Sequence, residues 1–137
     1  MYKKTNKCGI IYTKFLERSL SMHKDLLIKV INSEQNTEYT TKGVVTDKEI
    51  KYVENDELNT IAKFNLINNT LTRKNNNLRL RYPFVLDKET LGEVEIKELN
   101  KKIKVKIKAK KIEKKERSIR IEFSVEKEDF IYYIEEK

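Results

Sequence analysis

Three glutamates that lie close together in the sequence are the first candidates for chemistry. Glu93 and Glu95 are two positions apart, so a β-strand would place both carboxylates on one face, roughly 7 Å apart. Such a pair, with Glu98 nearby, can in principle supply a general acid and a general base. A catalytic carboxylate also needs an apolar pocket or a like-charged neighbour that shifts its pKa, and the sequence indicates neither. We favour the interpretation that these glutamates pair with a neighbouring lysine-rich strand.

Other chemical motifs are missing from the chain. With three glycines in total, the sequence contains neither a dinucleotide-binding fingerprint nor a phosphate-binding P-loop, and it has no GxSxG elbow. A single His23 and a single Cys8 cannot form a Cys/His zinc site or a convincing nucleophile and base pair. We therefore predict that the protein is not an enzyme, with no catalytic residues, no metal site and no cofactor.

The lysine-rich strand suggests a different function, contact with a polyanion. Residues 101 to 110 alternate lysine with Ile, Val or Ala, which predicts a strand with one apolar and one basic face. Basic stripes of this kind neutralise phosphates, and binding through them weakens as salt increases. The candidate contacts are Lys102, Lys104, Lys106, Lys108 and Arg120, with a second stripe of Arg73, Arg79 and Arg81.

Two observations make nucleic-acid binding the less favoured of the two interpretations of the lysine face. Single-strand binders need exposed aromatic rings, whereas Tyr52, Phe64, Tyr82, Phe84 and Phe123 share their parity with aliphatic residues and are predicted to be core. The net charge of +8 is also unevenly distributed. Residues 1–24 contribute +5 and residues 97–120 contribute +9, while residues 25–96 and 121–137 contribute −2 and −4. A solvated lysine face that discourages edge-to-edge pairing is the simpler explanation.

The rest of the chain predicts the scaffold that would position these residues. From Asp25 onward, about ten short strand-like segments are separated by polar breaks such as Asn68-Asn69, and no helix-period segment intervenes. This pattern favours an all-β antiparallel meander of about 8–10 strands, closed into a barrel because closure removes the exposed edges. We expect a fourth strand within Leu58 to Ile67, Pro83 at an edge, bulge or strand end, and Gly92 at the start of the seventh strand.

The N-terminal residues differ from the remainder. Residues 1–24 form a predicted basic leader, either a loop or a short helix, and residues 25–137 form a single β-barrel domain. The apolar stretch near Ile11 is too short for a secretion signal, and no run is long enough to span a membrane. The lone Cys8 fits a reducing compartment. These features favour a cytoplasmic protein.

Several short motifs resemble a known family. Thr41-Lys42-Gly43, Tyr52-Val53-Glu54, Thr60-Ile61 and the hairpin from Arg73 to Leu80 are similar to those of the YwiB-like bacterial proteins, over about residues 25 to 135. This resemblance implies a calycin-like, lipocalin-type barrel of unknown function, with no catalytic residues to transfer. Tyr82 to Gly92 departs from the family's Tyr-x-Thr-x-x-Gly spacing, and the basic leader is an addition.

Taken together, the sequence predicts a non-enzymatic barrel that binds a small apolar or amphipathic ligand, or a protein partner, at one open end. The ligand version requires an interior cavity of a few hundred Å³. An enzyme would instead require at least one inward-facing, buried Glu or Asp with a strongly raised pKa. The sequence leaves open whether the barrel interior is filled, which residues would contact a ligand, and the oligomeric state.

Overall fold

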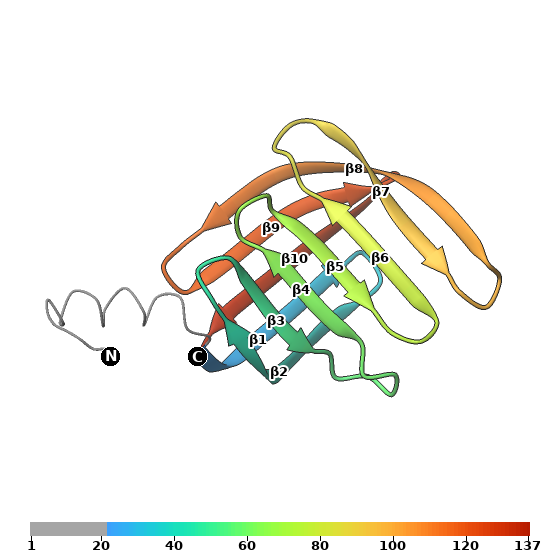
Figure 1. The fold of residues 1–137 in the computed structure, drawn as a ribbon. Helices are drawn as coiled ribbons and strands as arrows, with labels where there is room; N and C mark the ends of the chain where they lie inside the picture. Colours follow the sequence, from blue (N-terminus) through green and yellow to red (C-terminus); the bar gives the residue numbers. More distant parts are fainter. Residues whose placement is uncertain (1–21) are drawn as a thin grey trace, which may run out of the picture.

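The computed structural model describes residues 22–137, which form ten β-strands and no helix (Figure 1). The predicted leader therefore lies, except for its last three residues, outside the described residues. No helix long and apolar enough to cross a membrane occurs between residues 22 and 137. The strands are β1 (Met22–Asn32), β2 (Asn36–Val45), β3 (Glu49–Val53), β4 (Ile61–Asn65), β5 (Thr70–Lys74), β6 (Leu78–Pro83), β7 (Glu89–Ile96), β8 (Lys101–Lys114), β9 (Ser118–Val125) and β10 (Glu128–Glu136).

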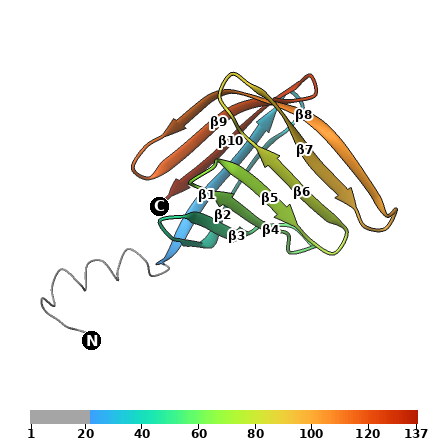
Figure 2. The same ribbon diagram turned by 45° about the horizontal axis from the view of Figure 1, so that its top comes forward.

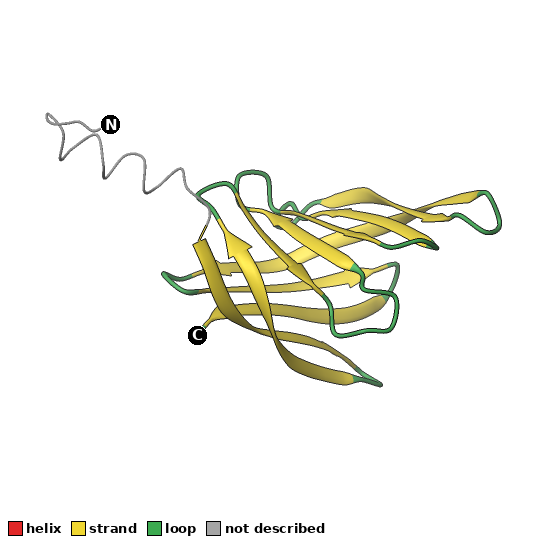
Figure 3. Cartoon of the chain, turned by 60° about the horizontal axis from the view of Figure 1, so that its bottom comes forward, coloured by secondary structure: helices red, strands yellow, loops and turns green. Residues whose placement is uncertain are grey.

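The ten strands form a closed antiparallel barrel in which each strand pairs with the next one along the chain (Figures 1 and 2). The first and last strands complete the ring, since β1 pairs with β10 from Leu26↔Glu136 to Asn32↔Phe130. Short loops connect the strands at both ends of the barrel (Figure 3). The predicted all-β meander, with about ten strands closed into a barrel, is confirmed.

The asparagine-rich breaks form turns for the expected reason. Asn65 accepts hydrogen bonds from the backbone N–H groups of Ile67 and Asn68 through its side-chain oxygen, and Asn69 adopts a positive φ of 55°. Asn75 does the same for the N–H groups two and three residues later. Asparagine stabilises such turns because its short side chain bonds to the local backbone and tolerates the left-handed region.

Three strand boundaries differ from the sequence-based prediction. The first strand begins at Met22, because residues 22–24 continue the pairing with β2. The fourth strand covers only Ile61–Asn65, since the preceding residues form a loop closed by Asp56. Gly92 lies inside β7 instead of opening it. Pro83 is the last residue of β6, one of the positions expected for it.

The lysine-rich strand is longer and less regular than predicted. Ile107 and Ala109 are buried, but Ile103 on the same face is 37% exposed because the β7–β8 hairpin extends past its neighbours (Figure 1). A β-bulge between Ala109 and Lys111 then shifts the register, so that Ile112 faces Ile121. Such a bulge increases local bend and twist, which helps a sheet curve into a barrel.

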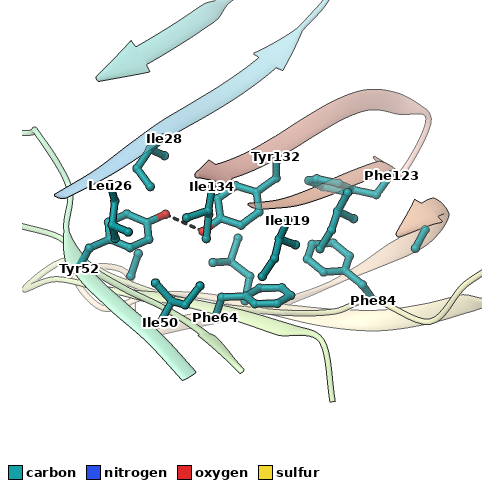
Figure 4. Close-up of a cluster of buried hydrophobic side chains, with 14 of the residues drawn as sticks. Leu26, Ile28, Ile50, Tyr52, Phe64, Phe84, Ile119, Phe123, Tyr132 and Ile134 are labelled. Carbon is teal, nitrogen blue, oxygen red and sulfur yellow. Dashed lines mark hydrogen bonds between the residues drawn. The ribbon is translucent and has the colours of Figure 1, made fainter. Parts of the chain in front are cut away.

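Inward-facing side chains fill one half of the barrel. Alternate residues of each strand point to the interior, as the period of two requires. Phe64 and Phe84 are the largest side chains in this half, and both are almost completely buried (Figure 4). Aliphatic side chains pack around them, chiefly Leu26, Ile28, Ile50, Ile119, Ile121 and Ile134. Of the aromatic residues predicted to be core, Tyr52, Phe64, Phe84 and Phe123 are buried and Tyr82 is half-buried.

Gly92 generates the first testable prediction. A Cβ atom at this position would lie 2.5 Å from Ile107 Cδ1 and 2.8 Å from the backbone oxygen of Arg81. Because the backbone oxygen cannot move away freely, Gly92→Ala should lower the free energy of unfolding by about 1–3 kcal/mol. Urea unfolding measures this change. Leu91→Ala, at an exposed neighbour, is the control and should stay within about 0.5 kcal/mol of the parent; equal stability of the two variants would contradict the prediction.

Candidate ligand-binding site in the barrel lumen

The half of the barrel that is not filled contains a cavity of about 310 Å³, which we call the lumen. It lies at the end where the β1–β2, β3–β4, β5–β6 and β9–β10 connections meet. The sequence left open whether the barrel interior is filled. The structure has this lumen at one end and a smaller hollow of about 180 Å³ at the other. It is lined by Val30, Asn32, Gln35, Thr37, Tyr39, Tyr52, Glu54, Leu71, Arg73, Leu80, Tyr82, Phe123, Val125, Phe130 and Tyr132.

One wall of the lumen is aromatic. The rings of Phe123 and Phe130 are stacked, with centroids 5.5 Å apart and planes 15° apart. Tyr82 approaches Phe123 edge-on at 6.4 Å. Residues 123 and 130 are cross-strand partners on β9 and β10, so the register itself brings the two rings together. Apolar walls of this type, with a few polar groups among them, are typical of small-molecule sites.

An ion pair between Glu54 and Arg73 lies inside the lumen. Arg73 donates from Nε to Glu54 Oε2 at 2.5 Å and from Nη2 to Oε1 at 2.7 Å. The Glu54 side chain is only 12% exposed and that of Arg73 is 35% exposed. The hydrogen bonds to Glu54 raise the pKa of Arg73 further above its usual value, against the opposing effect of burial. This two-point contact fixes the guanidinium in one orientation.

Four tyrosine side chains complete the polar part of the lumen. Tyr52 and Tyr132 share a hydrogen bond of 2.6 Å between their hydroxyls (Figure 4). Burial raises the pKa of both groups well above the ordinary tyrosine value. Burial and the negative charge of Glu54 likewise raise the pKa of Tyr39, and burial raises that of Tyr82. All four phenols are therefore neutral at physiological pH.

A small hydrogen-bond network supports the Glu54–Arg73 pair. Asp56 accepts hydrogen bonds from the backbone N–H of Thr60 at 2.9 Å and from its hydroxyl, and these bonds lower the pKa of Asp56. Thr60 is completely buried, and its hydroxyl also accepts a bond of 2.8 Å from Asn75. Glu54 is two residues before Asp56, and Arg73 is two residues before Asn75. The hydrogen bonds that join Asp56, Thr60 and Asn75 therefore fix the backbone close to both lumen charges.

Except for Arg73, the residues predicted to contact a polyanion lie on the outside of the barrel. Lys102, Lys104, Lys106 and Lys108 occupy the outer face of β8, opposite Glu95, Glu93, Leu91 and Glu89 of β7. On the other side of β7, Arg79 and Arg81 are opposite Glu95 and Glu93. Glu93 and Glu95 lie opposite the lysine strand as expected, and Glu93 is 3.3 Å from Lys104, whereas Glu98 lies in the turn before β8.

The structure separates two arginines from their predicted neighbours. Arg120 lies opposite Glu113 and contacts Glu122 at 3.2 Å. Lys108 lies opposite a different residue of β9, Ser124, so Arg120 is not its cross-strand partner. Arg73 points into the lumen and pairs with Glu54, whereas Arg79 and Arg81 face outward. The sequence contained a signal for this placement, because Arg73 shares its parity with Leu71. All three residues also border one outer groove.

The outer surface also carries a groove of about 510 Å³ that the sequence did not reveal. Here Lys51 lies directly opposite Lys63, and Lys74 lies opposite Arg79. The groove also contains acidic side chains, so its charge is mixed; they are Glu49, Glu93 and Glu95. Contact between this face and a nucleic acid stays a prediction.

Residues 22–137 contain no group of three or more His, Cys, Asp or Glu side chains that could hold a metal ion. His23 lies within β1 and is exposed, while Cys8 lies outside the described residues. The lumen offers groups for hydrogen bonding, ionic contact and aromatic packing.

The ion pair generates a second prediction. Glu54→Leu removes the partner of a partly buried guanidinium, which should lower the free energy of unfolding by about 1–3 kcal/mol, less than for a fully buried pair. The double variant Glu54→Leu/Arg73→Leu removes both charges and should recover to within about 1 kcal/mol of the parent protein. Urea unfolding measures both. Glu93→Leu, which removes one member of the exposed Glu93–Lys104 ion pair, is the control. A double variant that is less stable than Glu54→Leu would contradict the prediction, because it would show that the ion pair itself stabilises the barrel.

The buried tyrosines generate a third prediction, on pH. In the folded protein, the pKa values of Tyr52 and Tyr132 are higher than the value of about 10 that tyrosine has in an unfolded chain. Above that pH the unfolded state releases protons that the folded state retains, so stability falls by up to about 1.4 kcal/mol per pH unit for each group. Tyr52→Phe/Tyr132→Phe should make this fall shallower. Urea unfolding across the alkaline range gives both slopes, and identical slopes would refute the prediction.

Comparisons with known proteins support the fold and no more. No family model matches the chain, and no curated protein matches it. Among solved structures, the YwiB protein from Bacillus subtilis superposes with a TM-score of 0.55 and 16% sequence identity, covering 84% of this chain and 90% of that one. At this identity the likeness concerns architecture alone, and it agrees with the resemblance expected from the sequence. The chain is therefore a closed ten-stranded barrel that is similar in fold to YwiB.

Proposed function

We propose that this protein is a non-enzymatic, cytoplasmic barrel that binds a small amphipathic ligand in its lumen. The observation that carries the proposal is the cavity of about 310 Å³ above a packed floor, in which an aromatic wall and several polar groups converge. Small-molecule sites are usually concave and largely apolar, with a few polar groups that orient the ligand.

The dimensions of the lumen favour a compact ligand. Its volume is near the lower end of the range of about 300–1,000 Å³ for ligand pockets. The Phe123 and Phe130 rings offer a flat apolar surface, whereas Arg73, Glu54 and Tyr39 offer polar contacts. A molecule with an apolar body and one polar end matches both parts. An interior site of this kind suits a small molecule better than a protein partner.

A binding role is also more consistent with the state of Glu54 than catalysis is. Glu54 is an inward-facing carboxylate with a side chain only 12% exposed, and both of its oxygens accept hydrogen bonds from Arg73. A carboxylate that binds one guanidinium through both oxygens is held in a single orientation. Its two-point contact favours a fixed role in recognition.

The proposal predicts that a ligand enters the lumen and competes with any side chain that fills it. Prodan, an uncharged naphthyl ketone whose fluorescence increases in apolar surroundings, is a suitable reporter. Val125→Trp places a large ring in the lumen and should weaken Prodan binding by at least about tenfold, or about 1.4 kcal/mol. Fluorescence titration measures the affinity, and thermal unfolding checks that the variant is folded.

Leu91→Trp is the matched control, because it adds the same ring at an outward-facing residue that is 55% exposed. This variant should bind Prodan like the parent protein. If the folded parent protein binds no Prodan, or if both tryptophan variants bind it with unchanged affinity, the lumen is not the binding site.

A further inference from the structure

The charge balance of the lumen indicates which class of ligand it accepts. Among its lining residues, Glu54 is the only acid and Arg73 the only base, and they neutralise each other. Building on the function proposed above, we infer that the ligand is an uncharged, ring-containing molecule whose polar end is a carbonyl or amide. Carboxylates and ammonium compounds of the same shape are excluded by this inference.

Electrostatics disfavours a ligand of either sign. A carboxylate that approached Arg73 would also meet Glu54, whose oxygens lie 2.5 and 2.7 Å from guanidinium nitrogens. An ammonium group that approached Glu54 would meet Arg73 in the same way. Because the two charges of the pair are adjacent, attraction of an ion to one member is largely offset by repulsion from the other. The ion would also lose its hydration on entering, at further cost.

The unused hydrogen-bonding groups of the lumen suit a neutral acceptor. Arg73 uses Nε and Nη2 for Glu54, and its Nη1 donates to no residue between 22 and 137. Within the same range, no hydrogen bond is among the interactions that act on the hydroxyls of Tyr39 and Tyr82. The guanidinium N–H is a hydrogen-bond donor, and the two phenol hydroxyls can also donate. All three residues line the lumen. A carbonyl oxygen accepts such bonds without bringing a net charge.

The apolar wall supports the ring-containing part of the inference. Stacked Phe123 and Phe130, with Tyr82 edge-on, form an aromatic surface whose members come from β6, β9 and β10. Aromatic rings favour offset-stacked or edge-to-face contacts with other rings, which stabilise the pair beyond the effect of the area that they bury. A flat ring can therefore pack against this surface while its carbonyl faces Arg73 and Tyr39.

Three naphthalene compounds substituted at the same ring position separate charge from shape. Naphthamide is neutral, naphthoate is its anionic isostere, and naphthylmethylammonium is a cation of similar size. Isothermal titration calorimetry with the parent protein should show naphthamide binding at least about tenfold more tightly than either ion, which corresponds to about 1.4 kcal/mol. Equal or tighter binding of either ion overturns the inference.

Glu54→Gln tests whether the ion pair sets this preference. The variant leaves Arg73 with an uncompensated charge, so naphthoate affinity should rise by at least about tenfold relative to naphthamide. Glu93→Gln is the matched control, because Glu93 pairs with Lys104 on the outer face, and its ligand preference should equal that of the parent. An unchanged preference in Glu54→Gln overturns the role of the pair.

The outcomes distinguish this inference from the function on which it rests. If the ions bind as well as the amide, and Val125→Trp still blocks all three compounds, the lumen binds ligands but the assigned class is wrong. If none of the three compounds binds and Prodan does not bind either, the proposed function and the inference both fail.

Discussion

Closure of the sheet through β1 and β10 is the constraint on which the rest of the structure depends. Without this pairing, the ten-strand meander would have two long unpaired edges, each a template for association with another chain. Closure also fixes which parity faces inward. A slip of one residue between β1 and β10 would turn Leu26, Ile28 and Ile134 toward water. The register therefore specifies the core and the lumen together.

The two halves of the interior differ because different side chains reach into them. Phe64 and Phe84, with the surrounding isoleucines, pack across the interior at one end, where a smaller hollow of about 180 Å³ is bordered by Ile50, Ile119 and Ile134. At the other end the inward-facing residues include valines and polar side chains, which keep to the wall through their own contacts. Arg73 is held by Glu54, and the hydroxyls of Tyr52 and Tyr132 bond to each other. The lumen remains open because its longest side chains are tied to one another.

Much of the fold could be predicted from the sequence, since it depends on local patterns. Alternation along residues such as Ile119 and Ile121 marks a strand and its inner face, and asparagine clusters mark turns with a known mechanism. The fourth strand and Gly92 were misplaced because their boundaries depend on tertiary contacts. Asp56 closes a loop before β4, and Ile107 crowds the backbone beside Gly92.

The lumen could not be predicted in the same way. Alternation places Arg73 on the inner face with Leu71, but it cannot show that Glu54 lies within reach, because β4 separates the two strands in the sheet. The size of a barrel interior depends on strand tilt and stagger, which a single sequence does not express. The lysine face, by contrast, is conspicuous in the sequence and lies outside the barrel. The most visible charges are thus not the ones that line the candidate site.

The Glu54–Arg73 pair is better explained by recognition than by stability. Burial of an ion pair costs desolvation energy that its attraction barely offsets, so apolar residues of similar size would serve a purely structural purpose as well. The surrounding network of Asp56, Thr60 and Asn75 nevertheless holds the pair in place. Burial also keeps the lumen tyrosines neutral. The lumen consequently presents a polar surface with no net charge at physiological pH, which can select a ligand by its hydrogen bonds and shape instead of its charge.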